Sequence, residues 1–174
     1  MRRRDFLALT LLAFVRRGFA LNKDLRVLGC SVKGDRLYRV ETHRMLFQWV
    51  KHEGGDLYSV GMMSILAALT YPLYSVRVKP VGTELERDDN LATVEAGKRI
   101  ATFPSPLSGR IEEINEEVVR DPKTVNVKPY STWIVKIRAA RAEELGELVG
   151  ASEAAKRIKD VILEEDIDCS IVEE

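Results

Sequence analysis

Residues 94–109 read VEAGKRIATFPSPLSG, and this stretch decides the fold. Two strand-like segments, 91–95 and 99–103, flank Lys98, and the PSP turn with Gly109 follows them. This pattern predicts a β-hairpin with Lys98 at its tip. A hairpin of this kind would hold the lysine away from the surface on a rigid support.

Short apolar segments separated by turns continue from Asp24 to Arg138. Turn signals include HEGGD at 52–56, RDDN at 87–90 and RDPK at 120–123. Strands are expected at residues 27–32, 37–40, 45–50, 57–62, 73–78, 91–95, 99–103, 109–114 and 132–137. Many short strands between closely spaced turns predict a mostly β sandwich or barrel.

Helices are expected at two places. Residues 64–69 (SILAAL) favour a short helix inserted in the sandwich, ending before Tyr71-Pro72. Apolar spacing then predicts helices over 142–149 and 152–164, with Gly150 ending the first and Ser152 capping the second.

The expected organisation is an N-terminal extension over 1–23, a β domain over 24–140 and C-terminal helices over 141–174. About 35 residues cannot bury a core alone, so the C-terminal helices should pack on the β domain.

Composition excludes several function classes. The 174 residues include 27 acidic and 27 basic side chains, which are interleaved, so no basic face for nucleic acid is expected. The histidines His43 and His52 have neither the spacing of a zinc-binding helix nor that of a catalytic triad. No metal site and no catalytic centre are therefore predicted.

The two cysteines, Cys30 and Cys169, are too few for a zinc site or a disulfide-dense scaffold. Two reduced, unpaired thiols are the expectation, and one long-range disulfide is the alternative.

The N-terminal stretch MRRRDFLALTLLAFVRRGFA resembles an export signal of the twin-arginine type. Its apolar run over 6–15 is too short to span a bilayer, and Arg16 and Arg17 follow it. We expect no stable membrane insertion and a cytoplasmic location, with export as the alternative.

Residues 82–109 resemble the lipoyl and biotinyl carrier domains, whose pattern runs G-x-x-V-x-x-G-D-x-L-x-x-x-E-x-x-K with P-x-x-G downstream. The chain matches without a gap, and Asp88 stands where the family has glycine. Aspartate tolerates the left-handed backbone of such a position. Biotinyl lysines have methionine on both sides; here Gly97 and Arg99 flank Lys98, which favours lipoate.

A longer resemblance, over most of residues 35–149, is to the H protein of the glycine cleavage system. It rests on LYRVETH at 37–43, VGM at 60–62 with the following SILAAL, the hairpin at 94–109, and on Asn115, Asn126 and Trp133. This resemblance implies a lipoyl-type flattened barrel, a barrel–sandwich hybrid. It also implies a non-catalytic carrier with lipoate joined to Lys98 by an amide bond.

The same resemblance implies that Glu95 and Gly97 are the hairpin residues that the attaching enzyme recognises. The implied partners are a lipoate ligase or other lipoate-attaching enzyme, dihydrolipoamide dehydrogenase, glycine decarboxylase and aminomethyltransferase.

Three segments resemble a sister group, the lipoate-binding proteins of heterodisulfide-reductase-like sulfur oxidation. They are Gly29-Cys30, ATVEAGK at 92–98 and Ile167-Asp168-Cys169. They favour an arm that serves a heterodisulfide-reductase-like complex over an arm that carries the aminomethyl group of glycine cleavage. An unmodified structural or regulatory homologue is the alternative from another class.

Overall fold

The computed structural model describes residues 23–97 and 99–174; Lys98 and the signal-like N-terminal stretch lie outside the described residues. The described chain forms three antiparallel sheets. The largest has six strands, in the order β3 (Leu37–Glu41), β4 (Leu46–Gly54), β5 (Leu57–Met62), β11 (Val135–Ala139), β10 (Gly109–Ile114) and β7 (Glu84–Leu85). The second consists of β6 (Leu73–Val78), β8 (Asn90–Ala96) and β9 (Arg99–Pro104), and the third of β1 (Leu25–Val27) and β2 (Cys30–Val32).

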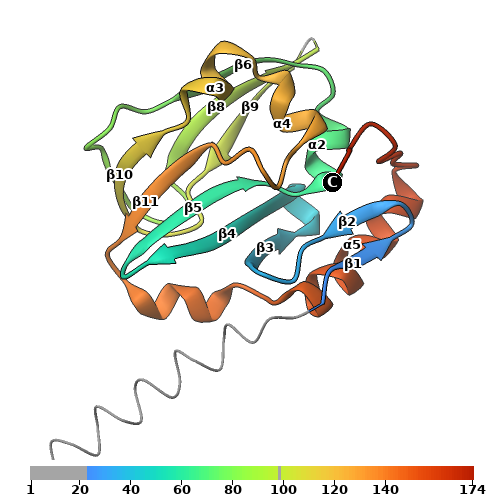
Figure 1. The fold of residues 1–174 in the computed structure, drawn as a ribbon, viewed down its shortest axis with the longest axis horizontal. Helices are drawn as coiled ribbons and strands as arrows, with labels where there is room; N and C mark the ends of the chain where they lie inside the picture. Colours follow the sequence, from blue (N-terminus) through green and yellow to red (C-terminus); the bar gives the residue numbers. More distant parts are fainter. Residues whose placement is uncertain (1–22, 98) are drawn as a thin grey trace, which may run out of the picture.

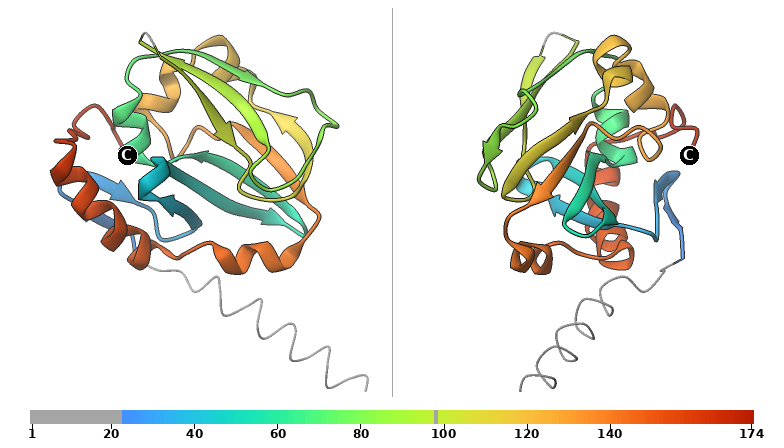
Figure 2. Two further views of the ribbon diagram at one scale, coloured as in Figure 1. Left: turned by 180° about the vertical axis from the view of Figure 1, so that it is seen from behind. Right: turned by 60° about the vertical axis from the view of Figure 1, so that its left-hand side comes forward.

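The three-stranded sheet lies against one face of the curled six-stranded sheet (Figures 1 and 2). Apolar side chains from both sheets fill the space between them, including Val60, Leu73, Val94, Phe103 and Ile137. The predicted class, a mostly β flattened barrel or sandwich with few helices, is confirmed.

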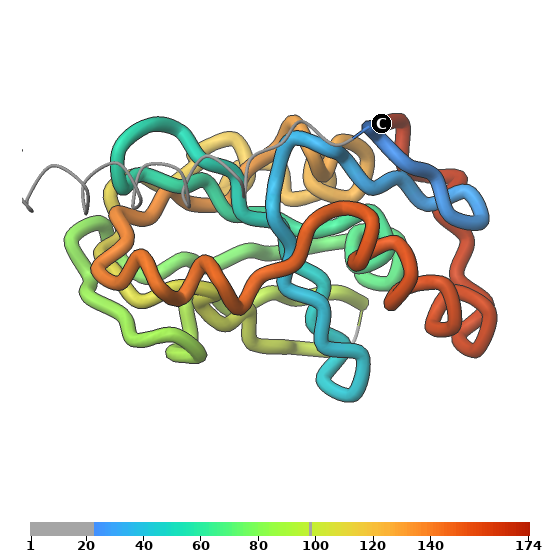
Figure 3. The backbone as a smooth tube through the Cα atoms, turned by 90° about the horizontal axis from the view of Figure 1, so that it is seen from below, coloured from blue at the N-terminus to red at the C-terminus, as the bar shows by residue number. Residues whose placement is uncertain are grey.

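Helices cover the ends of this sandwich. They are α2 (Ser64–Leu69), α3 (Glu116–Arg120), α4 (Lys123–Val127), α5 (Ala151–Glu164) and the 3-10 helices η1 (Thr42–Arg44) and η2 (Ala142–Glu147). Helices η2 and α5 run one after the other along one edge of the molecule (Figure 3). Among the described residues, no helix is long and apolar enough to cross a bilayer.

Strand β4 shows why α5 packs where it does. Its residues Leu46 to Val50 are buried without interruption, so both faces of the strand are covered. Val50 belongs to the core between the sheets, whereas Phe47 and Trp49 belong to a second core with Ile158 of α5. Alternating side chains point to opposite faces of a strand, so β4 separates the two cores.

Several expected elements are confirmed. Strands β5, β6 and β10 and helix α2 have the predicted bounds. The prediction of one strand over 27–32 is wrong, because Leu28 and Gly29 adopt positive φ and turn the chain between β1 and β2. The strand predicted over 132–137 begins at Val135 instead, since the backbone N–H of Thr132 bonds to Lys128.

The C-terminal helices also differ from expectation. The first is a 3-10 helix that ends at Glu147, and α5 begins at Ala151 with Gly150 as its N-cap. The prediction that Ser152 caps α5 is therefore wrong. Ala151 itself is fully buried against the second core, so packing draws the helix start one residue earlier.

The expectation of unpaired cysteines is wrong as well, because Cys30 and Cys169 form a disulfide. Both are buried, and the bond ties β2 to the tail that follows α5. The last residue secures the same tail, since the Glu174 carboxylate accepts hydrogen bonds at 2.9 Å from the backbone N–H groups of Tyr130 and Ser131.

A network of charges holds the turn before β8. Asp88 has a φ of 76°, which confirms that aspartate takes the left-handed conformation here. Its carboxylate accepts from the buried Arg39 at 2.6 Å and from Arg44 at 3.0 Å, and Glu41 accepts from the same two arginines. Burial alone would raise the pKa of Asp88, but hydrogen bonds from Arg39 and Arg44 outweigh it and lower the pKa.

The disulfide predicts a measurable stability difference. The two cysteines are separated by 139 residues, and closing a loop of that size restricts the unfolded chain by up to about 5 kcal/mol. The Cys30→Ala/Cys169→Ala variant should therefore lose about 3–5 kcal/mol in unfolding free energy by chemical denaturation, and reduced wild type should match it. Thiol titration of denatured, unreduced wild type should find none; two thiols would refute the bridge.

The Asp88 network predicts an acid-sensitive stability difference. Asp88→Asn keeps a residue that tolerates positive φ but removes the charge. It should lose about 1 kcal/mol at about pH 7, because Asp88 is 46% exposed and water screens its ion pairs. A carboxylate with a lowered pKa stabilises the fold above its unfolded pKa, near 3.8, and this contribution disappears as pH falls.

Urea denaturation of both proteins at about pH 7 and about pH 3 measures this difference. The difference between the two proteins should become smaller at the lower pH. An equal difference at both values would mean that the charge of Asp88 does not stabilise the turn.

Candidate functional site

The hairpin of β8 and β9 is the candidate site. The ladder pairs Glu95 with Ile100 and Ala96 with Arg99, so two residues of the chain, Gly97 and Lys98, connect the strands. Gly97 has a φ of +58°, the left-handed conformation that two-residue hairpin loops require. Glycine adopts this conformation without the steric cost that a side chain brings.

The surroundings of the tip are open. A side chain added at Gly97 would meet nothing within 4 Å, and Ile100 is 73% exposed. Glu95 is half-buried in the middle strand, and within the described part of the chain its carboxylate makes no ion pair. Lys98, predicted as the modified residue, lies outside the described residues, and Gly97 and Glu95 are one and three residues before it in the sequence.

The second turn of the motif closes the other end of the hairpin. The backbone N–H of Asp88 bonds to the carbonyl of Ser105 at 2.9 Å, and that of Ser105 bonds to Asp89 at 2.8 Å. Gly109 begins β10 where a side chain would overlap the backbone oxygen of Arg138 on β11. The glycine is thus required by close strand packing, since its own φ is not in the left-handed region.

Sequence reasoning missed the segment that supports the tip from the side. Strand β6 pairs Leu73 with Ala96 and Ser75 with Glu95, so Tyr74 is the extra residue of a bulge. Bulges re-aim side chains, and Tyr74 is exposed beside the hairpin. An aromatic residue in a predicted strand is normally interpreted as part of the hydrophobic core. Only a sequence pattern that predicts a bulge would have indicated that Tyr74 is exposed.

Other parts of the described chain offer weaker candidates. A cavity of about 390 Å³ is lined by residues of β7, β10 and β11, away from the tip, and its arginines are Arg110, Arg138 and Arg141. Each of them is already paired with a carboxylate, so no cation is available for an anionic ligand. Within residues 23–97 and 99–174, no three His, Cys, Asp or Glu side chains are grouped to hold a metal ion.

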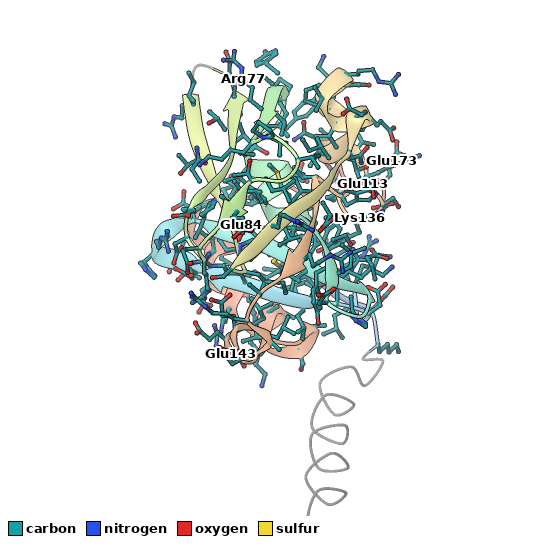
Figure 4. The ribbon with its side chains drawn as sticks, turned by 90° about the vertical axis from the view of Figure 1, so that its left-hand side faces the viewer. Arg77, Glu84, Glu113, Lys136, Glu143 and Glu173 are labelled. Carbon is teal, nitrogen blue, oxygen red and sulfur yellow. A yellow bond between two sulfur atoms is a disulfide. The ribbon has the colours of Figure 1, made fainter. Side chains whose placement is uncertain are left out.

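Some of the charged side chains that surround the sandwich are also paired. Figure 4 shows Lys136 and Glu113 side by side on β11 and β10, where they form an ion pair at 2.9 Å. Arg77 of β6 lies at the hairpin end of the molecule in the same view, and Glu143 lies at the opposite end.

Comparison with known proteins agrees with this geometry. The family model described as "Glycine cleavage H-protein" matches residues 37–161. "Glycine cleavage system H protein 1" of Aquifex aeolicus is 63% identical over 140 residues, which cover 80% of this chain and 98% of that protein. "Probable glycine cleavage system H protein 2" of Sulfurisphaera tokodaii is 34% identical, with 82% and 96% covered.

A solved structure shares the fold. The crystal structure of a glycine cleavage system H protein from Mycobacterium marinum superposes with a TM-score of 0.61 at 27% identity, covering 72% of this chain and 97% of that one. H proteins carry lipoate covalently on a lysine and have no catalytic centre of their own. The chain therefore belongs to the glycine cleavage H-protein family, and its cofactor is lipoate.

Proposed function

We propose that lipoate is joined to Lys98 and that the chain shuttles intermediates on this arm between partner enzymes. The observation that carries the proposal is the hairpin ladder. Pairing of Ala96 with Arg99 confines residue 98 to a two-residue connection, and the space around Gly97 is open. A prosthetic arm attached there would have room to move, and the sheet behind it would hold its base in place.

The residues around the tip fit this group. Attachment replaces the leaving group on the activated lipoyl carboxyl with the Lys98 amine, which loses a proton and its charge. Lipoate, when bound, supplies reversible thiol–disulfide chemistry. Glu95, three residues before the lysine in the sequence, offers a carboxylate for recognition by the attaching enzyme, and Gly97 allows the tight turn.

The system that we propose for the carrier is heterodisulfide-reductase-like sulfur oxidation. The hairpin of this chain reads ATVEAGK at 92–98, which resembles the hairpin of the lipoate-binding proteins. The other two segments of that resemblance, around Cys30 and Cys169, are joined by the disulfide and so act as one feature. The names of the relatives favour the second candidate, an H protein of glycine cleavage.

The cytoplasm is the location that we propose, because Arg16 and Arg17 follow the short apolar run over 6–15, where the cleavage region of an export signal is usually uncharged. Export of the twin-arginine type is the alternative, and the length of the purified native chain tests it.

Intact-mass measurement of the chain purified from its own organism tests the modification. A lipoyl-sized adduct is expected on wild type and on Lys79→Ala, a matched lysine elsewhere on the surface. Lys98→Arg, which keeps the charge, should lose the adduct completely, because guanidinium is not a substrate for amide formation. Unmodified wild type under all growth conditions would favour the structural or regulatory homologue, and streptavidin binding would favour a biotin carrier.

Exchange of glycine carboxyl carbon with bicarbonate, catalysed by glycine decarboxylase, separates the two systems. The lipoylated chain should support this exchange at least about tenfold more weakly than a bona fide H protein, a difference of about 1.4 kcal/mol in recognition. It should bind the purified heterodisulfide-reductase-like complex instead. Equal exchange together with no such binding would assign the chain to glycine cleavage.

A further inference from the structure

Exposed apolar side chains gather beside the hairpin tip. Tyr71 and Tyr74 are each 56% exposed, and Ile100 is 73% exposed. Tyr74 lies in the bulge of β6, and Ile100 lies on β9 directly opposite Glu95. Because β8 is the middle strand, Glu95 has β6 on one side and β9 on the other. We call these four residues, Tyr71, Tyr74, Glu95 and Ile100, the tip surface.

The tip surface is held rigidly from within. Asn126 of α4 is fully buried, and its amide spans the gap between two elements. Its Oδ1 accepts from the Leu73 N–H at 2.9 Å, and its Nδ2 donates to the Ala67 carbonyl of α2 at 2.7 Å. The connection that carries Tyr71 is therefore fixed at both ends, and Tyr74 follows directly.

The fold makes little use of these side chains itself. Within the described residues, neither tyrosine hydroxyl makes a hydrogen bond, and the Glu95 carboxylate has no partner. Tyrosine is enriched at protein interfaces, where it buries a large area and its hydroxyl finds a partner. Two such residues on a rigid support next to an unpaired carboxylate have the composition of a docking site.

The place of the tip surface identifies which partner would use it. Lipoate attachment takes place at the lysine nitrogen, so the attaching enzyme has to enclose the hairpin tip and contact its neighbours. Partners that use the lipoylated arm react with the dithiolane at its far end, so they do not have to contact the residues around the lysine. Resting on the function proposed above, we infer that the tip surface is the docking surface of the lipoate-attaching enzyme.

Loading kinetics test this inference. A purified lipoate–protein ligase that modifies the wild-type chain is given ATP and lipoate, and the adduct is followed by intact mass. Tyr71→Ser/Tyr74→Ser should raise KM for the carrier about tenfold with kcat nearly unchanged, since lost docking contacts weaken binding and leave the chemistry intact. Ile100→Ser, which changes a residue on a different strand of the same surface, should also raise KM for the carrier.

The matched control is Leu163→Ser, which removes a 62% exposed apolar side chain from α5. It should load with wild-type KM, and all variants should unfold at the wild-type temperature. Once loaded to completion, the tip variants should be reduced by dihydrolipoamide dehydrogenase at the wild-type rate, because that enzyme acts on the far end of the arm.

The outcomes separate the two claims. Wild-type KM in the tip variants would overturn the docking surface while leaving lipoylation of Lys98 intact. Wild-type loading of the tip variants followed by slow reduction would also overturn the inference. It would mean that the tip surface is a docking surface of dihydrolipoamide dehydrogenase. A wild-type chain that no ligase modifies at Lys98 would instead refute the proposed function.

Discussion

The pairing of Ala96 with Arg99 is the constraint on which the rest of the structure depends. It leaves two residues to reverse the chain, and a hairpin this tight is stable only when its strands have a sheet to rest on. Inward-facing residues of β8 and β9, such as Val94 and Phe103, supply that support by packing onto the six-stranded sheet. The tip itself then needs no packing and can remain open to solvent.

Support from the side comes from a polar group. A buried amide is costly unless its hydrogen bonds are made, and both ends of the Asn126 amide bond to backbone groups. Those groups, at Ala67 and Leu73, belong to the chain on either side of the turn that carries Tyr71. The backbone N–H of Leu73 would otherwise be left unpaired beside the bulge, so the bulge that exposes Tyr74 and the buried Asn126 depend on each other.

These dependencies explain how far the sequence could predict the structure. Strands β5, β6 and β10 were predictable because their apolar residues are local and bounded by turns, and α2 because Pro72 follows it. Helices α3 and α4 have five residues each, too few to show a helical repeat in the sequence. Helix α3 begins at Glu116 after the N-cap Asn115, whose side chain accepts from the backbone N–H of Glu117.

The other failures are tertiary in origin. Pairing of Cys30 with Cys169 requires α5 to pack against the β1–β2 hairpin. No local sequence pattern predicts that long-range contact. Hairpin residues Glu95 and Gly97 were predicted from the resemblance to lipoyl carriers. Tyr74 could not be predicted in this way, since the bulge exists only once β6 pairs with β8.

Helix α2 connects the two cores of the molecule. Through this helix, the core that contains the disulfide is coupled to the core that supports the β8–β9 hairpin. Ile65 belongs to the core under α5, while Leu66 packs against both cores. Ser64, at the start of the helix, donates at 2.8 Å to the carbonyl of Ser31, the residue after the disulfide-bonded Cys30. At its other end the helix leads directly to Tyr71. The position of Tyr71 and Tyr74 in the tip surface is thus set from both sides, by Asn126 and by the tail that the disulfide holds.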